Sequence, residues 1–157
     1  YKRQGWYYLD QYAQYQNTLF SSPGPMDGRG MFCSVDNTFY AHKLILCFNV
    51  HPNFVAGWDY SINTQYTFPL QQWVHVAVVR NGANVVVYVN GSAVSTTNIG
   101  SGSTIDDCGN GFHVGCYPNI YKGDSNHLVG SLEGYLDDFR VSVGIARYTG
   151  TFAPSEL

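Results

Sequence analysis

The sequence contains few charged residues: Asp, Glu, Lys and Arg make up 12% of its 157 positions, about half of the usual share. Eight Lys and Arg against eleven Asp and Glu leave a net charge of -3, so the chain lacks the basic excess that marks a nucleic-acid-binding surface. It also lacks an apolar run near the roughly 20 residues that cross a bilayer as a helix. We therefore expect neither a nucleic acid partner nor membrane insertion.

Residues needed for common hydrolytic sites are scarce as well. The chain has two glutamates, Glu133 and Glu156, whereas glycoside hydrolysis requires two carboxylic acids placed across the scissile bond. The Asp pairs at 106–107 and 137–138 are adjacent in sequence, and adjacent strand residues point to opposite faces. No G-x-S-x-G or H-E-x-x-H motif occurs. The sequence therefore predicts a protein that is not an enzyme, with glycoside hydrolysis as a remote alternative.

Helical periodicity and metal-binding cysteine motifs are also missing. No segment longer than about ten residues keeps a 3.6-residue period, although QYAQYQN at 11–17 could form a helical turn or two. The four cysteines have no CxxC or Cys/His metal spacing. Among the three possible pairings we favour the local pairs Cys33 with Cys47 and Cys108 with Cys116, and buried free thiols are the alternative.

Short β-branched and aromatic runs, separated by turn residues, fill most of the chain. The clearest is WVHVAVVRNGANVVVYVNGSAV at 73–94, whose two Asn-Gly pairs supply the positive φ angles of tight hairpins. It predicts a three-stranded meander with strands at 74–80, 85–89 and 93–97. Further strands are predicted at 5–9, 18–21, 31–35, 43–50, 60–68, 111–115 and 134–143.

Many short strands joined by Gly, Pro, Asn and Asp clusters are typical of a β-sandwich or jelly roll. We therefore predict an all-β fold, a two-sheet antiparallel β-sandwich (jelly roll), in which residues 1–157 form a single domain. The chain begins YKRQGWYY, with neither an initiator Met nor a signal-like apolar segment. We accordingly expect a processed product or a fragment of a longer chain.

Both faces of the predicted meander are apolar. His75 lies among valines, and we interpret it as a hydrogen-bonded structural histidine. Because a sandwich requires only one apolar face per sheet, the second face needs cover from loops, from a neighbouring domain or from another subunit. Alternation places Val74, Val76, Val78, Val85, Val87 and Val89 on one face, and Trp73, His75, Ala77, Val79, Val86 and Tyr88 on the other.

The strand predicted at 134–143 breaks its period of two at Asp137 and Asp138. A β-bulge at this pair would restore the register and re-aim one side chain. That carboxylate could face a rim loop and help to hold a structural Ca²⁺ ion, which prefers oxygen ligands. The alternative is a salt bridge to Arg140 or Arg147, or hydrogen bonds to backbone amides.

Three stretches of the chain form a series over residues 71–155, in the order QQWVHVAVVRNGANVVVYVNGSAV, FHVGCY and GSLEGYLDDFRVSVGIARYTGTFAPSE. Together they resemble the laminin-G-like, concanavalin A-like lectin jelly-roll domain. In that family a W-x-H-V-A strand leads into an L-Y-V-N-G hairpin, and later come I-G and G-x-I-D-D-x-R-I strands. A closing G-V-A-R-Y-T-x-x-F-x-P segment is typical of the versions in phage tail and virion proteins. The first seventy residues match loosely, with GWYYLD in place of the usual E-F-W-V strand.

The resemblance implies a fold of two antiparallel sheets and a role in sugar binding, adhesion, or the structure of virions and cell-surface proteins. We accordingly expect an extracellular or virion-surface location. In the closing ARYTGTF segment we expect architectural roles: Tyr148 packs across a sheet edge and directs its hydroxyl at backbone, and Arg147 pairs with an Asp of the bulge.

Aromatic residues make up 16% of the chain. Two predicted loops, HPNFVAGWDYS at 51–61 and GCYPNIYKGDSNH at 115–127, combine them with Asn, Asp and His. Flat rings stack on the C–H faces of sugars while polar side chains bind the hydroxyls, although each ring could instead fill the core. The candidate ligand-binding residues are Trp58, Asp59, Tyr60, Tyr117, Asn119, Tyr121 and Asp124.

Two functional hypotheses follow. The first is a non-catalytic recognition or adhesion module of an extracellular or virion assembly, which binds carbohydrate or another cell-surface ligand through rim loops. The second is a structural packing subunit of a virion, tail fibre or surface filament, whose partners are other protein subunits or domains of the same assembly. The aromatic loops favour the first hypothesis, and the doubly apolar meander favours the second.

Overall fold

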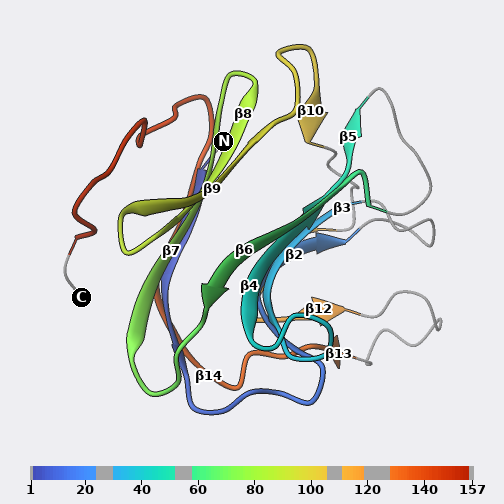
Figure 1. The fold of residues 1–157 in the computed structure, drawn as a ribbon, viewed down its shortest axis with the longest axis vertical. Coiled ribbons are helices and arrows are strands. Elements are labelled where there is room, and N and C mark those ends of the chain that lie inside the picture. The colour runs from blue at the N-terminus through green and yellow to red at the C-terminus, as the bar shows by residue number, and fades with distance from the viewer. Residues whose placement is uncertain (1, 24–29, 52–57, 106–110, 119–127, 156–157) are drawn as a thin grey trace. The chain divides into compact units, whose positions relative to one another are not determined.

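The computed structural model of the protein defines residues 2–23, 30–51, 58–105, 111–118 and 128–155 (Figure 1). Every strand pair in these residues is antiparallel. The described residues contain no helix that is long and apolar enough to span a membrane. The two main sheets have five strands each, which confirms the predicted all-β, two-sheet antiparallel class.

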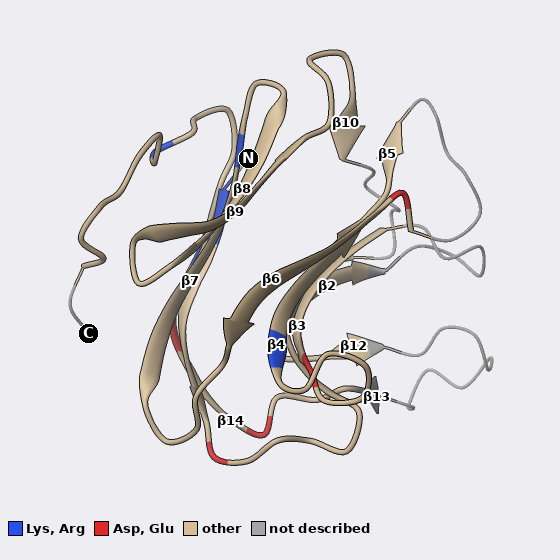
Figure 2. Ribbon diagram, in the orientation of Figure 1, with Lys and Arg blue, Asp and Glu red and all other residues tan. Residues whose placement is uncertain are grey.

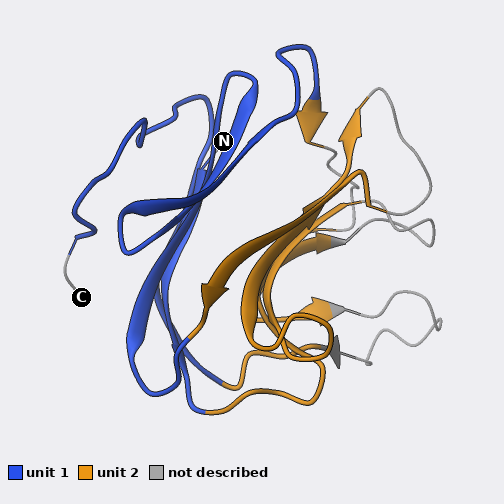
Figure 3. Cartoon of the chain, in the orientation of Figure 1, with its two compact units in different colours: residues 1–10, 69–103, 134–157 blue, residues 11–68, 104–133 orange. Residues whose placement is uncertain are grey.

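Contacts divide the chain into two compact units, each containing one of the five-stranded sheets (Figure 3). Each unit is assembled from segments that are separated in the sequence. That residues 1–157 act as a single domain stays a prediction. Unit 1 comprises residues 1–10, 69–103 and 134–157, and unit 2 comprises residues 11–68 and 104–133.

Unit 1 is the predicted meander extended by the first and last strands of the chain. Its turns use the positive φ angles expected from the two Asn-Gly pairs: 57° at Gly82, 47° at Asn90 and 80° at Gly91. Glycine adopts such angles at little cost because it has no Cβ. The order across the sheet is β14 (Gly134–Ser142), β1 (Lys2–Leu9), β7 (Trp73–Asn81), β8 (Asn84–Val89) and β9 (Ser92–Asn98).

The second apolar face of this sheet is covered by the chain's own closing segment, residues 146–155. The rings of Tyr148 and Phe152 stack with their centroids 3.4 Å apart, and the Phe152 amide donates to the Gly91 carbonyl oxygen at 3.1 Å. The sequence left open whether loops, a neighbouring domain or another subunit cover this face. In the structure, a loop segment of the same chain covers it. The cluster consists of Ala77, Val79, Val86 and Tyr88 on the sheet and Ala146, Tyr148 and Phe152 on the closing segment.

Unit 2 contains the other five-stranded sheet and two short ladders that the sequence did not predict. The sheet order is β11 (His113–Val114), β2 (Gln16–Pro23), β3 (Gly30–Asp36), β4 (Lys43–Phe48) and β6 (Tyr60–Thr67). The ladders pair β5 (Val50–His51) with β10 (Thr104–Ile105), and β12 (Tyr117–Pro118) with β13 (Leu128–Val129).

The helical turn predicted at 11–17 is wrong, because Gln16 and Asn17 already belong to β2. The buried Asn17 side chain accepts a hydrogen bond from the Ala13 amide at 3.0 Å and donates one to the Gln11 carbonyl oxygen at 3.2 Å. Asparagine side chains compete in this way with the backbone bonds of a helix. The segment before β2 is therefore held as a loop.

The predicted bridge between Cys33 and Cys47 is also wrong, since both are buried free thiols. The register places Cys33 opposite Leu46 and Cys47 opposite Phe32. Successive strand residues point to opposite faces, so the two sulfur atoms lie on different sides of the sheet. Cys116 is likewise a free thiol, and Cys108 lies outside the described residues.

Burial should make these thiols unreactive in the native protein. It raises the pKa of Cys33 and raises the pKa of Cys47 to about 11, and only the thiolate attacks a thiol reagent. At pH 8 we expect Cys47 to be modified by a disulfide reagent roughly 100-fold more slowly in the native than in the urea-unfolded protein. An intact mass that increases on reduction would contradict the free-thiol state.

Candidate functional site

Unit 2 presents a cluster of aromatic rings on one face of its sheet. Strand alternation places Phe32, Ile45 and Cys47 together on this face, where they are buried. Two further rings pack edge-to-face on Phe32, with ring centroids 5.0 Å away for Trp58 and 5.5 Å away for Tyr117. Aromatic pairs prefer this geometry over a face-to-face stack. We call Phe32, Trp58 and Tyr117 the aromatic cluster.

Trp58 and Tyr117 reach Phe32 from separate parts of the chain. Trp58 lies just before β6, which pairs with β4 in the same sheet. Tyr117 begins β12, and the Ser21 hydroxyl of β2 donates to the neighbouring Cys116 carbonyl oxygen at 2.7 Å. The sheet thus holds both loop residues against one strand, so the cluster is positioned by regular structure.

Polar side chains flank the aromatic cluster in rows across β3, β4 and β6. Ser61 lies beside Cys47, with the hydroxyl oxygen 3.3 Å from the sulfur, and Asn63 lies beside Ile45. Ser61 is exposed and Asn63 is half-buried, so hydroxyl and amide groups are available next to the rings. Such a surface can hold a ligand that has both apolar C–H faces and hydroxyls. The rows are Phe32–Cys47–Ser61, Ser34–Ile45–Asn63 and Asp36–Lys43–Thr67.

The structure brings together two of the predicted ligand-binding residues, Trp58 and Tyr117. Asp59 instead accepts a hydrogen bond from the backbone amide of Val50 at 2.8 Å. Tyr60 stacks on a buried phenylalanine of β4, with the ring centroids 5.0 Å apart, on the opposite face of the sheet. Three further candidates, Asn119, Tyr121 and Asp124, lie outside the described residues.

Sequence reasoning missed Phe32, Ser61 and Asn63 as members of this surface. Strand alternation could have indicated them, because along β3 and β6 it puts Phe32 on the face opposite to Cys33 and Ser61 on the face opposite to its neighbours. The pattern does not state which face carries the loop aromatics. That information comes from the position of β12 beside β2.

The β-bulge predicted at Asp137 and Asp138 is present, and Asp138 has a φ of 48°. The Asp138 Oδ1 atom accepts a hydrogen bond from Arg140 Nε at 2.7 Å. The salt bridge that the sequence offered as the alternative to calcium is therefore present, and its partner is Arg140. The expected pairing of Arg147 with the bulge is wrong. Asp137 Oδ1 accepts from the Asp138 amide at 2.6 Å. No group of three or more His, Cys, Asp or Glu within the described residues could hold a metal, whereas Ca²⁺ takes about six to eight oxygen ligands. That the Asp pair helps to hold a Ca²⁺ ion therefore stays a prediction.

His75 is part of the packing of unit 1. The side chain is 1% exposed and lies between the rings of Trp6 and Phe152, with centroids 5.3 and 5.7 Å away. Burial, with a smaller effect of the nearby Lys2 ammonium, lowers the pKa of His75 to about 4, so the ring is neutral at pH 7. The Nδ1 atom has no hydrogen-bond partner in the described structure. The predicted structural histidine is thus held by aromatic packing and not through a hydrogen bond at Nδ1.

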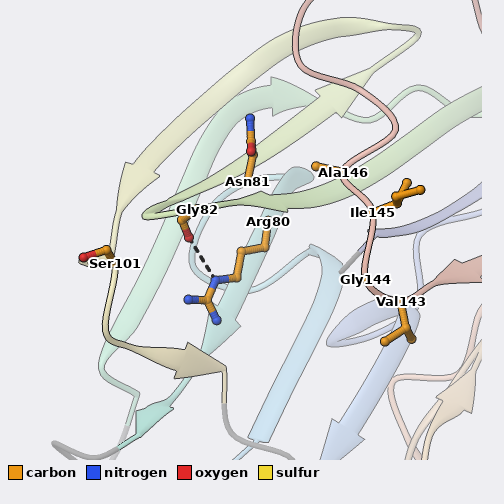
Figure 4. Close-up of a pocket in the computed structure, with 8 residues that line it drawn as sticks. All are labelled: Arg80, Asn81, Gly82, Ser101, Val143, Gly144, Ile145 and Ala146. Carbon is orange, nitrogen blue, oxygen red and sulfur yellow. Dashed lines mark hydrogen bonds between the residues drawn. The ribbon is translucent and has the colours of Figure 1, made fainter.

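A hollow of about 440 Å³ in unit 1 lies between the β7–β8 turn and residues 143–146 (Figure 4). Arg80 carries its charge, but the guanidinium already donates to the carbonyl oxygens of Gly82, at 3.1 Å, and Ser103. Val143 and Ile145 contribute exposed apolar surface on the other side. With its cation engaged by backbone, this hollow offers little chemistry for a ligand.

Solved structures share this fold. A provisionally described carbohydrate binding protein from Bacteroides ovatus is 16% identical with a TM-score of 0.63, and the match covers 88% of this chain and 36% of that chain. Domain 4 of AbnA, a GH43 extracellular arabinanase from Geobacillus stearothermophilus, in complex with arabinotriose, is 19% identical with a TM-score of 0.53, covering 88% and 57%. The native heptameric SAP-like pentraxin from Limulus polyphemus is 20% identical with a TM-score of 0.52, covering 88% and 61%. The chain thus spans less than two thirds of each of these chains.

Sequence comparison agrees with the fold. No curated protein sequence matches the chain. A laminin G family profile, described as the concanavalin A-like lectin/glucanases superfamily, matches residues 4–144. Since these residues are most of the chain and form the two antiparallel sheets, the protein belongs to the concanavalin A-like lectin/glucanases superfamily.

Proposed function

We propose that this protein is a non-catalytic carbohydrate-binding module and that the aromatic cluster of unit 2 is its sugar-binding surface. The observation that carries the proposal is the convergence of Trp58 and Tyr117, from separate segments of the chain, on Phe32. Both loop rings are only partly buried, so part of each remains open to a ligand. The solved structures of a provisionally described carbohydrate binding protein and of a domain in complex with arabinotriose support the same class of ligand.

The surface would bind a sugar through two complementary contacts. The partly exposed rings of Trp58 and Tyr117 pack on the apolar C–H face of a pyranose or furanose ring. The adjacent Ser61 hydroxyl and Asn63 amide exchange hydrogen bonds with sugar hydroxyls. Because the contacts lie on one side of the ligand, we expect affinities in the micromolar to millimolar range, about -4 to -8 kcal/mol.

The proposal of a non-catalytic module is supported by the hydrogen bonds of two described carboxylates in unit 2, those of Asp36 and Asp59. Asp36 Oδ1 accepts from three backbone amides, those of Thr38, Phe39 and Tyr40, at 2.6 to 3.1 Å. Asp59 accepts from a backbone amide of β5. Carboxylates that close loops in this way are not placed as an acid and base pair. Release of reducing sugar from a bound oligosaccharide would reinstate the glycoside hydrolase alternative.

Replacing Trp58 with alanine should weaken sugar binding by roughly tenfold or more. Binding would be measured by calorimetry with arabino-oligosaccharides and by a glycan array. Trp73→Ala is the matched control, because Trp73 is also a half-buried tryptophan packed on one ring, Tyr8, at 5.6 Å, but it belongs to unit 1. Equal affinity of Trp58→Ala and the wild type, or no binding to any glycan by the folded wild type, would overturn the proposal.

A structural packing subunit of a virion, tail fibre or surface filament is the second candidate. Its support is the exposed apolar surface at the edge strand of unit 1: Tyr135, Val143 and Ile145 are each more than half exposed on or just after β14. Symmetric oligomers together with an empty glycan array would favour this candidate. An extracellular or virion-surface location belongs to the same proposal and applies to both functions.

A further inference from the structure

A second hollow in unit 1, of about 590 Å³, gathers three basic side chains: Lys2, Arg140 and Arg147. The whole chain has eight Lys and Arg and a net charge of -3, so this is a local concentration of positive charge in an acidic protein. Figure 2 shows basic positions at the start of β1 and on the segment that follows β14. The hollow shares no lining residue with the hollow at Arg80.

The sheet and the closing segment build this hollow together. Cross-strand pairing places Lys2 opposite Ser142 and Gln4 opposite Arg140, so these side chains project from one face of the β1–β14 ladder. The closing segment then adds Arg147 and Tyr148. The Lys2 ammonium lies 3.5 Å from the centroid of the Tyr148 ring, a cation–π contact that fixes its position.

Two buried side chains of the hollow are only partly satisfied. Lys2 is 3% exposed and Gln4 is 2% exposed, and the Gln4 Oε1 atom has no hydrogen-bond partner in the described structure. Within the same described residues, no carboxylate pairs with Lys2 or Arg147. Asp138 does bind Arg140, but only through Nε at 2.7 Å, which leaves the terminal guanidinium nitrogens to donate. The hollow thus presents cationic donors together with one buried acceptor that lacks a donor.

We infer that this hollow binds the anionic group, a carboxylate or sulfate ester, of an acidic saccharide. The ammonium of Lys2, the guanidinium groups and the Ser142 hydroxyl donate to the oxyanion. Gln4 Oε1 accepts from a hydroxyl next to that anion. A free inorganic oxyanion without a hydroxyl proton leaves this acceptor unpaired, at the cost of a buried polar group, and the volume suits a ligand larger than a single ion.

The site uses residues different from those of the aromatic cluster, and it does not depend on sugar binding there. The probes that test it are sodium D-glucuronate, which has the anion and the hydroxyls, D-glucose, which has only the hydroxyls, and inorganic sulfate, which has only the charge. Titrations followed by amide chemical shifts should show saturable shifts at Ser142, Arg147 and Tyr148. We expect glucuronate to bind roughly tenfold more tightly than either other probe.

Arg147→Gln should weaken glucuronate binding by roughly tenfold. Arg147 is exposed, so the variant keeps the packed Tyr148 and Phe152 rings and is expected to fold. The control is Lys43→Gln, which removes the same charge in unit 2 and should leave the glucuronate affinity read from the Ser142 and Tyr148 shifts unchanged. Absence of glucuronate shifts at these residues, equal binding of sulfate and glucuronate, or equal losses in Arg147→Gln and Lys43→Gln would each overturn the inference.

Discussion

Gly91→Ala is expected to lower the free energy of unfolding by about 3 to 5 kcal/mol. A Cβ at this position would lie 1.7 Å from the Phe152 carbonyl oxygen, and Gly91 has a φ of +80°. Because the obstructing atom is backbone, the closing segment must move away from the sheet and expose the stacked Tyr148 and Phe152 rings. Left-handed strain accounts for about 1 to 2 kcal/mol, and lost aromatic burial accounts for the rest.

The first Asn-Gly pair of the meander, Asn81-Gly82, supplies the matched control. Gly82 also has a positive φ, +57°, but a Cβ there would meet nothing within 4 Å. Gly82→Ala should therefore cost only the strain, about 1 to 2 kcal/mol. Urea unfolding, followed by tryptophan fluorescence, compares the two variants with the wild type. Equal losses in Gly91→Ala and Gly82→Ala would show that the closing segment does not rest on this turn.

Acidification from pH 7 to pH 4 is expected to remove up to about 3 kcal/mol of stability through His75 alone. The pKa of His75 is lowered to about 4 in the folded protein, from the ordinary value of 6.5. Between these two values the unfolded chain binds a proton that the folded chain does not, so the free energy of unfolding rises with pH. The contribution is fully present above pH 6.5 and is lost as the pH falls toward 4.

The measurement is the pH dependence of urea unfolding in His75→Leu, compared with the wild type and with His51→Asn. His75→Leu should flatten the slope between pH 6.5 and 4, and His51→Asn, which removes an exposed histidine of β5, is the control for the loss of a histidine outside the core. Since Leu could disturb the packing, the His75 ring resonance of the wild type gives a second readout: a pKa near 6.5 would contradict the expectation.

The features of the fold that depend only on residues close together in the chain were predicted correctly from the sequence. The Asn-Gly turns and the alternating valines of the meander are local, and the register of β7 and β8 places them as expected. The bulge at Asp137 and Asp138 followed from a break in the same period of two. The failed disulfide prediction overlooked the register between β3 and β4, which a local pattern does not contain and which puts Cys33 and Cys47 on opposite faces of the sheet.

The candidate site was predictable only in part for the same reason. The sequence indicated that Trp58 and Tyr117 belong to ligand-type loops, but not that both would lie on Phe32. The sequence also predicted Asp59 and Tyr60 as ligand-binding residues. In the structure Asp59 accepts a hydrogen bond from a backbone amide, and Tyr60 lies on the opposite face of the sheet. These outcomes depend on which strand each loop follows and on the pleat of that strand.

The sequence by itself determined that this chain is an all-β protein, with a three-stranded meander whose two faces are both apolar. Only the tertiary structure decided what covers the second face: residues 146–155, which lie far from the meander in sequence and meet it at Gly91. It also decided that Lys2 and Arg147, near opposite ends of the chain, line one hollow. The physical reason is that alternation and turn chemistry act over a few residues, whereas the strand order of a sheet sets which distant segments touch.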